Sequence, residues 1–275
     1  MIVNQLPESG SAEPLDASGI ECRGVEHIYG TGEGATIALS RLDLEIPRNQ
    51  IVTVVGPSGC GKSTLLYILA GLLRPTTGEV TLGGRLITGP GADRAMVFQS
   101  DAVFPWYTVR QNLEYGPRST GVPAKERDAR VNQFLALVGL EERADKHPKE
   151  LSGGMRKRVD LARAYTNHPE VLLMDEPFGA LDAITKERMQ YELLRLAQAR
   201  PTTIVFITHD LEEALFVGDR VIVMSAGPAR VVADIDVPFG SERSDDLRAD
   251  PEFQKMRRDL RDVFATQHRN PENLP

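Results

Sequence analysis

Hydrophobic and polar residues alternate in the first part of the chain. The clearest alternation has its apolar positions at Ile37, Leu39, Leu42, Leu44 and Ile46. This period predicts a half-buried strand, and residues Ile20 to Ile28 predict another strand before it. Because glycines punctuate the connection from Gly30 to Gly34, we expect the two strands to form an antiparallel β-region.

The next segment has a different pattern. Residues Ile51 to Val55 are all β-branched, which is typical of a strand covered on both faces. A glycine-rich loop follows, and residues Lys62 to Leu73 have the apolar spacing of a helix. The pattern therefore predicts a strand, a loop and a helix in succession.

The rest of the chain is predicted to alternate between strands and helices. After a short strand at Arg94 to Phe98, residues from about Thr108 to Asn167 are helical in character and indicate an inserted α-helical subdomain at about residues 100–167. Apolar strands return at Val171–Met174, Thr203–Thr208 and Val221–Met224, separated by helical patterns at Ala183–Gln198 and Asp210–Phe216. This order predicts an α/β fold with a mostly parallel sheet.

The two ends of the chain differ from this core, which we place at residues 19–240. Residues 1–18 are expected to be a disordered lead, without the apolar segment of a secretory signal. Residues 241–275 form a tail in which Phe253, Met256, Leu260 and Phe264 recur at helical spacing. We expect this tail to be an amphipathic helix that packs against its own domain.

Composition narrows the class of protein. The chain is 41% hydrophobic and 26% charged, which suits one globular unit, and its net charge of −7 argues against a groove for nucleic acid. No apolar run approaches the roughly 18 residues that span a bilayer. Cys22 and Cys60 are too few for a disulfide framework, so a reducing cytoplasm is the expected location.

The glycine-rich loop carries the clearest chemistry. It reads Gly56, Pro57, Ser58, Gly59, Cys60, Gly61, Lys62, Ser63 and Thr64, the G-x-x-x-x-G-K-[ST] pattern between a predicted strand and helix. In this pattern backbone N–H groups surround phosphate oxygens, Lys62 reaches the terminal phosphates and Ser63 binds Mg²⁺. Cys60 is either an activated thiol or a small residue tolerated at a variable position.

Two acidic residues end the strand at Val171–Met174. Asp175 is suited to hold Mg²⁺, and Glu176 to polarise an attacking water. Alternatively, the two acids cap the next helix. The preceding phosphate loop favours the nucleotide reading.

Further motifs resemble those of ATP-binding cassette (ABC) proteins. Leu151-Ser-Gly-Gly-Met155 is similar to the family's signature sequence, in the family's order between phosphate loop and acidic strand. Other matches are Gln99 of the Q-loop, Asp182 ending the D-loop, His209 of the switch and Tyr29, which resembles the aromatic that stacks on adenine. Taken alone, His209 could be a surface or capping residue and Tyr29 a core aromatic.

The resemblance implies a fold and a mechanism. The fold is a P-loop NTPase core of the ABC type, with an antiparallel β-subdomain and the helical subdomain. Two copies pair head to tail, so that Ser152, Gly153 and Gly154 of one copy close over the nucleotide of the other. The implied catalytic residues are Glu176, His209, Gln99 and Lys62, and the implied ligands of Mg²⁺ are Ser63, Gln99 and Asp175.

The resemblance also suggests which ABC protein this is. The chain has one cassette, and Phe104-Pro-Trp-Tyr-Thr-Val109 is similar to the nitrate, sulfonate and taurine importer branch. A homodimer would then power uptake of a small oxyanion-type nutrient at the cytoplasmic face of the inner membrane, with a separate permease and, indirectly, a periplasmic or lipid-anchored substrate-binding protein. The permease would contact Phe104 to Tyr107, where Trp106 is either an exposed anchor or a buried residue of the helical subdomain.

Two other functions remain open. One is a soluble ABC ATPase that acts on a macromolecular complex, and the other is a nucleotide-binding regulator without turnover. The signature region also departs from the common family pattern, with Met155, Lys157 and Asp160 in place of glutamine, glutamine and a small apolar residue. We expect Asp160 to point to solvent or to pair with Lys157 or Arg163, since a carboxylate facing the nucleotide would repel phosphate.

Overall fold

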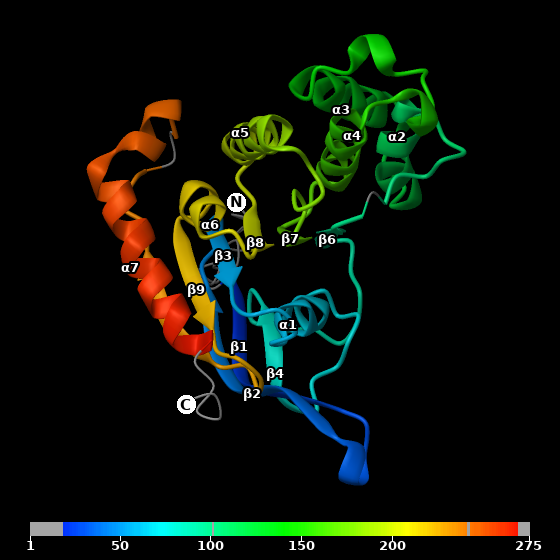
Figure 1. The fold of residues 1–275 in the computed structure, drawn as a ribbon. Coiled ribbons are helices and arrows are strands. Elements are labelled where there is room, and N and C mark those ends of the chain that lie inside the picture. Colours follow the sequence, from blue (N-terminus) through cyan, green and yellow to red (C-terminus); the bar gives the residue numbers. More distant parts are fainter. Residues whose placement is uncertain (1–18, 101, 241–242, 269–275) are drawn as a thin grey trace, which may run out of the picture.

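The computed structural model describes residues 19–100, 102–240 and 243–268 and contains two sheets (Figure 1). The predicted lead at residues 1–18 lies outside the described residues. The smaller sheet is antiparallel, in the order β2-β1-β4-β5. Its strands are β1 (Ile20–Tyr29), β2 (Thr36–Ile46), β4 (Thr77–Leu82) and β5 (Arg85–Leu86). The long pair β1–β2, joined through the 3₁₀ turn η1 (Gly32–Gly34), confirms the expected antiparallel β-region.

The larger sheet forms the core of the molecule. Its order is β10-β9-β3-β8-β7-β6, with every pair parallel except β10–β9. The strands are β3 (Ile51–Val55), β6 (Arg94–Val97), β7 (Val171–Asp175), β8 (Thr203–Ile207), β9 (Arg220–Met224) and β10 (Val231–Asp236). All residues of β3 and β8 are buried, as continuous apolar runs predict for strands covered on both faces.

Helix α1 (Lys62–Leu69) lies between the two sheets. Its Leu65 and Leu69 are buried in a core shared with β1, β2 and β3. The helix is shorter than the predicted range to Leu73, because Gly71 has a left-handed φ of 73°. A Cβ at Gly71 would lie 2.2 Å from the carbonyl oxygen of Gly89, so this close approach requires glycine.

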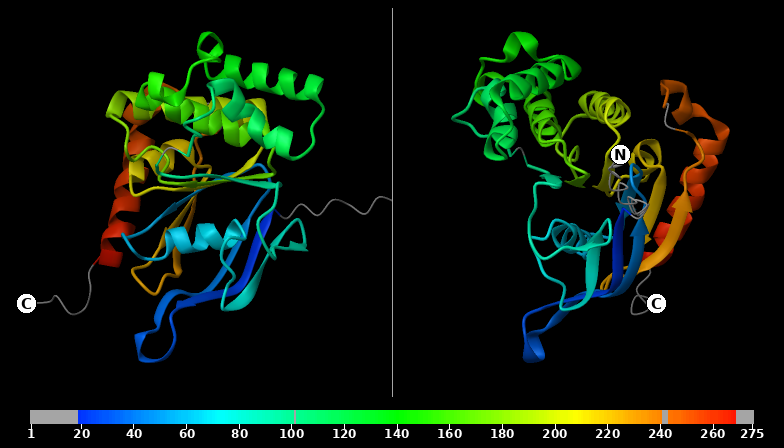
Figure 2. Two further views of the ribbon diagram at one scale, coloured as in Figure 1. Left: turned by 90° about the vertical axis from the view of Figure 1, so that its right-hand side faces the viewer. Right: turned by 180° about the vertical axis from the view of Figure 1, so that it is seen from behind.

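The inserted helical subdomain projects beyond one edge of the larger sheet (Figures 1 and 2). Its helices are α2 (Val109–Ser119), α3 (Ala124–Leu137) and α4 (Gly153–Thr166), with the short 3₁₀ turns η2 (Glu141–Arg143) and η3 (Pro148–Glu150) between α3 and α4. Phe134 and Tyr165 pack together in its core. Helix α4 also contacts β6, which connects the subdomain to the sheet.

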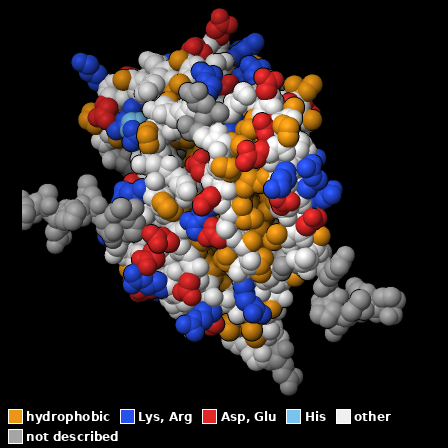
Figure 3. Space-filling view, turned by 90° about the vertical axis from the view of Figure 1, so that its left-hand side faces the viewer, with side chains coloured by type: hydrophobic (Ala, Val, Ile, Leu, Met, Phe, Trp, Pro, Cys, Tyr) orange, Lys and Arg blue, Asp and Glu red, His pale blue; other side chains and the backbone are white. Residues whose placement is uncertain are grey.

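The remaining helices cover the face of the larger sheet opposite α1. They are α5 (Ala183–Ala199), α6 (Leu211–Val217), η4 (Asp245–Ala249) and α7 (Pro251–His268). Phe253 and Leu260 of α7 are buried and the helix packs against α6, which confirms the expected amphipathic tail helix. On this side of the molecule, charged groups flank a strip of hydrophobic side chains (Figure 3). Within the described ranges, no helix has both the length and the apolar character needed to cross a bilayer.

Strands β4, β5 and β10 were not predicted. Thr77–Leu82 begins with polar residues and Gly78, which are unusual in strands, and β5 is only two residues long. Strand β10 alternates half-buried and exposed residues at the sheet's edge. In each case pairing with a neighbouring strand outweighs weak local preference.

Candidate functional site

The phosphate loop connects β3 to α1 and adopts a backbone that only glycine adopts readily. Gly61 precedes α1 with φ 118°, and a Cβ there would lie 2.6 Å from the carbonyl oxygen of Ala38. Lys62 is buried, and its Nζ donates hydrogen bonds of 2.8 Å to the carbonyl oxygens of Gly56 and Pro57. The lysine charge is therefore held inside the curve of the loop.

A cavity of about 770 Å³ opens over this loop. Its lining comprises Tyr29, Ala35, Thr36, Ile37, Ala38, Ser58, Gly59, Cys60, Gly61, Lys62, Ser63, Thr64, Glu176, Gly227 and Pro228. Tyr29 is 44% exposed and its hydroxyl lies 3.2 Å from Thr64 Oγ1, so its ring is available at the rim rather than buried in the core. The residues of β2 and of the β9–β10 turn were not predicted, because no local motif marks them.

Two side chains whose oxygen atoms could bind a divalent cation lie near the start of α1. The Ser63 side chain lies near Asp175, at the end of β7. Burial raises the pKa of Asp175, an effect that Ser63 and Lys62 oppose and nearby Glu176 reinforces. A hydroxyl and a carboxylate near each other match the hard oxygen ligands that Mg²⁺ prefers, so the residues present fit this ion.

Glu176, Gln99 and His209 meet at the carboxyl ends of β7, β6 and β8. Glu176 adopts a left-handed φ of 43°, a conformation that costs about 1–3 kcal/mol and is typical of functional positions. His209 Nδ1 donates a hydrogen bond of 3.1 Å to Glu176 Oε2. A Cβ at Gly179 would lie 3.5 Å from Gln99 Nε2 and 3.7 Å from Glu176 Oε2, so both groups border this glycine.

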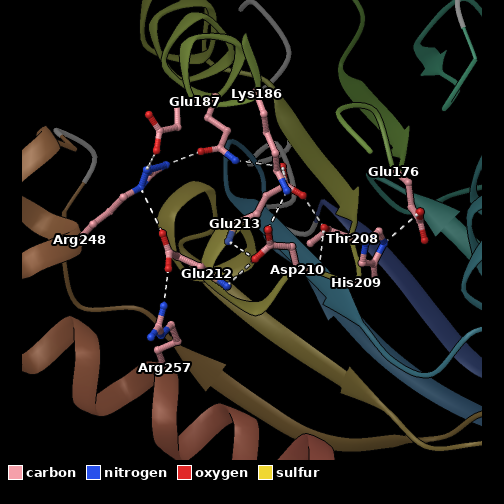
Figure 4. A network of polar contacts seen from close by, with 11 residues as sticks. Glu176, Lys186, Glu187, Thr208, His209, Asp210, Glu212, Glu213, Arg248 and Arg257 are labelled. Carbon is pink, nitrogen blue, oxygen red and sulfur yellow. Dashed lines mark hydrogen bonds and ion pairs between the residues drawn. The ribbon is translucent and has the colours of Figure 1, made fainter. Parts of the chain in front are cut away.

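A polar network holds the backbone on both sides of His209 (Figure 4). Thr208 donates its hydroxyl proton to buried Glu213, and the Asp210 N–H donates to Thr208 Oγ1 at 3.1 Å. Lys186 of α5 pairs with Asp210 at 2.7 Å and with Glu213 at 3.5 Å. Farther out, Glu212 pairs with Arg257 of α7, so the network reaches the tail helix. None of these supporting residues was predicted, because only the fold brings α5, α6 and α7 together.

Cys60 lies within the loop but is buried. Burial raises the pKa of its thiol, and the charge of Lys62 only partly opposes this effect. The possibility of an activated thiolate is therefore wrong for this structure, and Cys60 is a small packed residue.

The signature residues lie outside this cavity. Ser152 begins α4 as its N-cap, and its Oγ accepts a hydrogen bond of 3.3 Å from the Met155 N–H. Gly154 is closely packed, since a Cβ there would lie 2.7 Å from Thr185 Cγ2. Asp182 caps α5 and accepts a bond of 3.1 Å from the Thr185 N–H, which lowers the pKa of Asp182. The structure thus does not bring Ser152, Gly153, Gly154 or Asp182 to the phosphate loop of the same chain.

The segment Phe104 to Tyr107, the aromatic loop, is held in a defined shape. Asn112 of α2 is fully buried; its Oδ1 accepts a 2.7 Å bond from the Phe104 N–H, and its Nδ2 donates to the carbonyl oxygens of Phe104 and Tyr107. Trp106 is 65% exposed, so the buried alternative is wrong. Asn112 was not predicted, because it follows the polar residues Arg110 and Gln111 and no local pattern distinguishes it.

Asp160 does not face solvent. It is fully buried and pairs with Lys157 at 3.7 Å and with Arg163 at 2.9 Å. Of the two expectations for this residue, pairing is confirmed and solvent exposure is wrong. Its carboxylate faces the interior of its own chain.

Comparison with known proteins agrees with this geometry. Residues 39–179 match the family model described as ABC transporter. The chain is 47% identical over 239 residues to the taurine import ATP-binding protein TauB of Rhizobium johnstonii, covering 84% of this chain and 90% of that protein. It is 44% identical over 242 residues to the nitrate import ATP-binding protein NrtD of Synechocystis sp., covering 86% and 91%.

A solved structure is similar over most of the chain. A dimeric structure of MJ0796, a bacterial ABC transporter cassette, has a TM-score of 0.70 and 32% sequence identity, covering 80% of this chain and all of that one. A post-hydrolysis structure of the same cassette, bound to ADP and Pi, has a TM-score of 0.69. These relatives are transporter ATPases and give no support to a soluble ATPase acting on a macromolecular complex. The chain therefore belongs to the ABC transporter family, as an ATP-binding and ATP-hydrolysing subunit.

Proposed function

We propose that two copies of this chain hydrolyse ATP between them and so power import of a small oxyanion-type or sulfonate nutrient through a separate membrane permease. The observation that carries this proposal is the division of the site. The phosphate loop lines a cavity that lacks the signature residues Ser152 to Gly154, although the chain contains both. A second copy can supply the missing half, and the dimeric cassette of similar fold supports this arrangement.

ATP would occupy the cavity over α1. The loop from Gly56 to Thr64 offers backbone N–H groups and the N-terminus of α1 to the phosphates, while Lys62 exchanges its two carbonyl partners for phosphate oxygens. Tyr29, exposed at the rim, would stack on the adenine. Asp182 would contribute from the D-loop at the dimer interface.

Mg²⁺ would be held by Ser63 and Asp175, with Gln99 close to the same region. When bound, the ion neutralises charge that develops on the phosphate oxygens. Ser63 and Asp175 lie close to each other, so oxygens of both are available to one ion. Within the described part of the chain there is no cluster of three or more His, Cys, Asp or Glu side chains that could hold a metal. ATP phosphates and water would supply further oxygen ligands.

Glu176 would take a proton from the attacking water. Its Oε2 accepts a hydrogen bond of 3.1 Å from His209 Nδ1, and this bond orients the carboxylate beside Gly179, where Gln99 also lies. His209 would contact the γ-phosphate when the dimer closes, with its backbone fixed by the network around Thr208 and Asp210. These roles also argue against a regulator without turnover, because both the proton acceptor and its positioning partner are present.

The signature residues would complete the site from the partner. Ser152 and the first N–H groups of α4 form an oxygen-binding helix N-terminus, and Gly153 and Gly154 would lie beside the partner's γ-phosphate. Only ATP bridges both copies, so hydrolysis removes the contacts that hold the pair closed. Closure and opening then form a mechanical cycle.

The aromatic loop would transmit the closure and opening of the dimer to the permease. Trp106 presents a large aromatic surface on a loop that Asn112 fixes, which is typical of an interface anchor. The names of the relatives, taurine and nitrate import proteins, support a permease partner and a small cargo that carries a sulfonate or nitrate group. The dimer would lie at the cytoplasmic face of the inner membrane, and a periplasmic or lipid-anchored substrate-binding protein would deliver the cargo.

The test is to co-express the chain with a candidate permease from the same genome, purify both in detergent and reconstitute them in liposomes. The proposal predicts a stable complex and ATP-dependent uptake of taurine, another sulfonate or nitrate. Binding of the purified chain to ribosomes or DNA, with no permease complex, would refute the import function.

A further inference from the structure

Three charged residues occupy one face of α4, spaced one helical turn apart. Lys157 and Asp160 have side chains 1% and 0% exposed, and Arg163 is 18% exposed. We name this set the charge triad. The Asp160 carboxylate lies 3.7 Å from Lys157 Nζ and 2.9 Å from Arg163 Nη2. Since desolvation offsets most of the attraction in buried ion pairs, stability is a poor explanation for three charges at this place.

One end of the charge triad is bound to the Q-loop. Lys157 Nζ donates hydrogen bonds to the carbonyl oxygens of Phe98 at 2.6 Å and Gln99 at 3.3 Å. These carbonyls follow directly on the end of β6, at the residue that borders Glu176. The backbone of Gln99 is therefore attached to α4, the helix that begins with Ser152.

The other end is bound to the aromatic loop. The Arg163 guanidinium lies 5.2 Å from the centre of the Phe104 ring, a cation–π distance. Phe104 in turn contacts Trp106 at 5.7 Å and Tyr115 at 4.7 Å between ring centres. A continuous series of contacts thus runs from Gln99 through α4 to Trp106.

We propose that the charge triad is a positioning device that links Gln99 to the aromatic loop, so that a change at Gln99 on nucleotide binding moves Trp106 through α4. This inference rests on the proposed function, in which Gln99 senses the nucleotide and the aromatic loop contacts the permease. Asp160 joins the two cations and is the central member. The triad reaches the two sites only through the Gln99 backbone and the Phe104 ring, so its members are positioning residues. The departures of Lys157 and Asp160 from the common family pattern then form one matched pair.

The experiment uses Trp106, the only tryptophan of the chain, as its reporter. The full-length chain is titrated with Mg²⁺ and a non-hydrolysable ATP analogue, and affinity is measured by calorimetry alongside tryptophan emission. The wild type should show a saturable change in emission. The double variant Lys157→Gln/Asp160→Ala removes one buried charge of each sign and leaves Arg163, which is 18% exposed, without Asp160. Its unfolding temperature is therefore measured alongside, and it should bind the analogue within about twofold. Its emission change should be smaller by about fivefold or more.

Two further variants secure the interpretation. Lys149→Gln is the control for Lys157→Gln, because it replaces an exposed lysine just before α4 by glutamine. It should show the wild-type change in tryptophan emission. Arg163→Gln removes the contact of the triad with Phe104 and should also lose the emission change. This variant tests the same inference if the double variant is unstable. A full emission change in the double variant or in Arg163→Gln, or none in the wild type, would overturn the inference. Failure of the wild type to bind the analogue would instead refute the proposed ATP site.

Discussion

Replacing Glu176 with glutamine isolates its proposed chemical role. The side chain keeps its volume, and both residues are unbranched at Cβ, so the left-handed backbone at φ 43° is equally strained in both. The amide oxygen can still accept the hydrogen bond from His209, which spans 3.1 Å in the wild type. What is lost is the ability to take a proton from water.

The expected loss follows from that single change. General-base catalysis contributes about 10²- to 10⁴-fold, or about 3–5 kcal/mol in the activation barrier, so steady-state phosphate release should fall by this factor. ATP affinity should stay within about twofold, because Lys62, Ser63 and the loop are unchanged. The variant should also accumulate as an ATP-bound dimer, which size-exclusion chromatography with light scattering would detect.

A matched control is Glu79→Gln, the same chemical change at an exposed side chain of β4. It should retain wild-type turnover. Turnover of the Glu176→Gln variant within about threefold of wild type would refute the role of Glu176 as proton acceptor. Loss of ATP binding in that variant would show instead that the substitution damages the phosphate site.

Three further predictions concern separate parts of the molecule. Lys62→Ala should weaken ATP binding by about tenfold or more in calorimetry, since charge-assisted hydrogen bonds to phosphate contribute about 1.5–3 kcal/mol; undiminished affinity would contradict the phosphate-loop assignment. Trp106→Ala should lower permease affinity and transport by about tenfold while basal hydrolysis stays within about twofold, and an equal loss of both would indicate a structural role. Burial, assisted by the charges of Arg200 and Arg130, lowers the pKa of His168 from 6.5 to about 4. Between these two pKa values His168 binds a proton more readily in the unfolded chain than in the folded one. The free energy of unfolding should therefore fall as the pH drops from 6.5 to about 4, by no more than about 1.4 kcal/mol per pH unit. Denaturation curves at pH 7 and 5 should show a smaller difference for His168→Asn, which suits the φ of 53° there; an unchanged difference would exclude His168 as the cause.

The core of the fold could be predicted where local pattern and burial agree. Ile51–Val55 was predicted to the residue because both faces of β3 are covered, so every position is apolar or β-branched. Strand β4 was missed because its first half is exposed and polar, and its pairing with β1 decides its conformation. The end of α1 was misplaced because the close approach of Gly71 to Gly89 is a tertiary contact.

The candidate site divides in the same way. The phosphate loop is one continuous segment, so its pattern and its geometry coincide. Glu176, Gln99 and His209 come together only because β6, β7 and β8 are adjacent in the sheet, an order that strand patterns do not determine. The contact of Lys157 with the Gln99 carbonyl joins residues far apart in sequence, and only the structure reveals it.

The central claim is that each ATP site is shared between two copies of the chain. It is tested by mixing two inactive variants, Lys62→Ala and Ser152→Asp, the second of which keeps a helix-capping residue but places a negative charge against the partner's γ-phosphate. A mixed dimer carries both defects in one site and leaves the other intact, so an equal mixture should recover about a quarter of wild-type ATPase activity. A mixture no more active than the two variants measured separately would contradict a site built across the dimer.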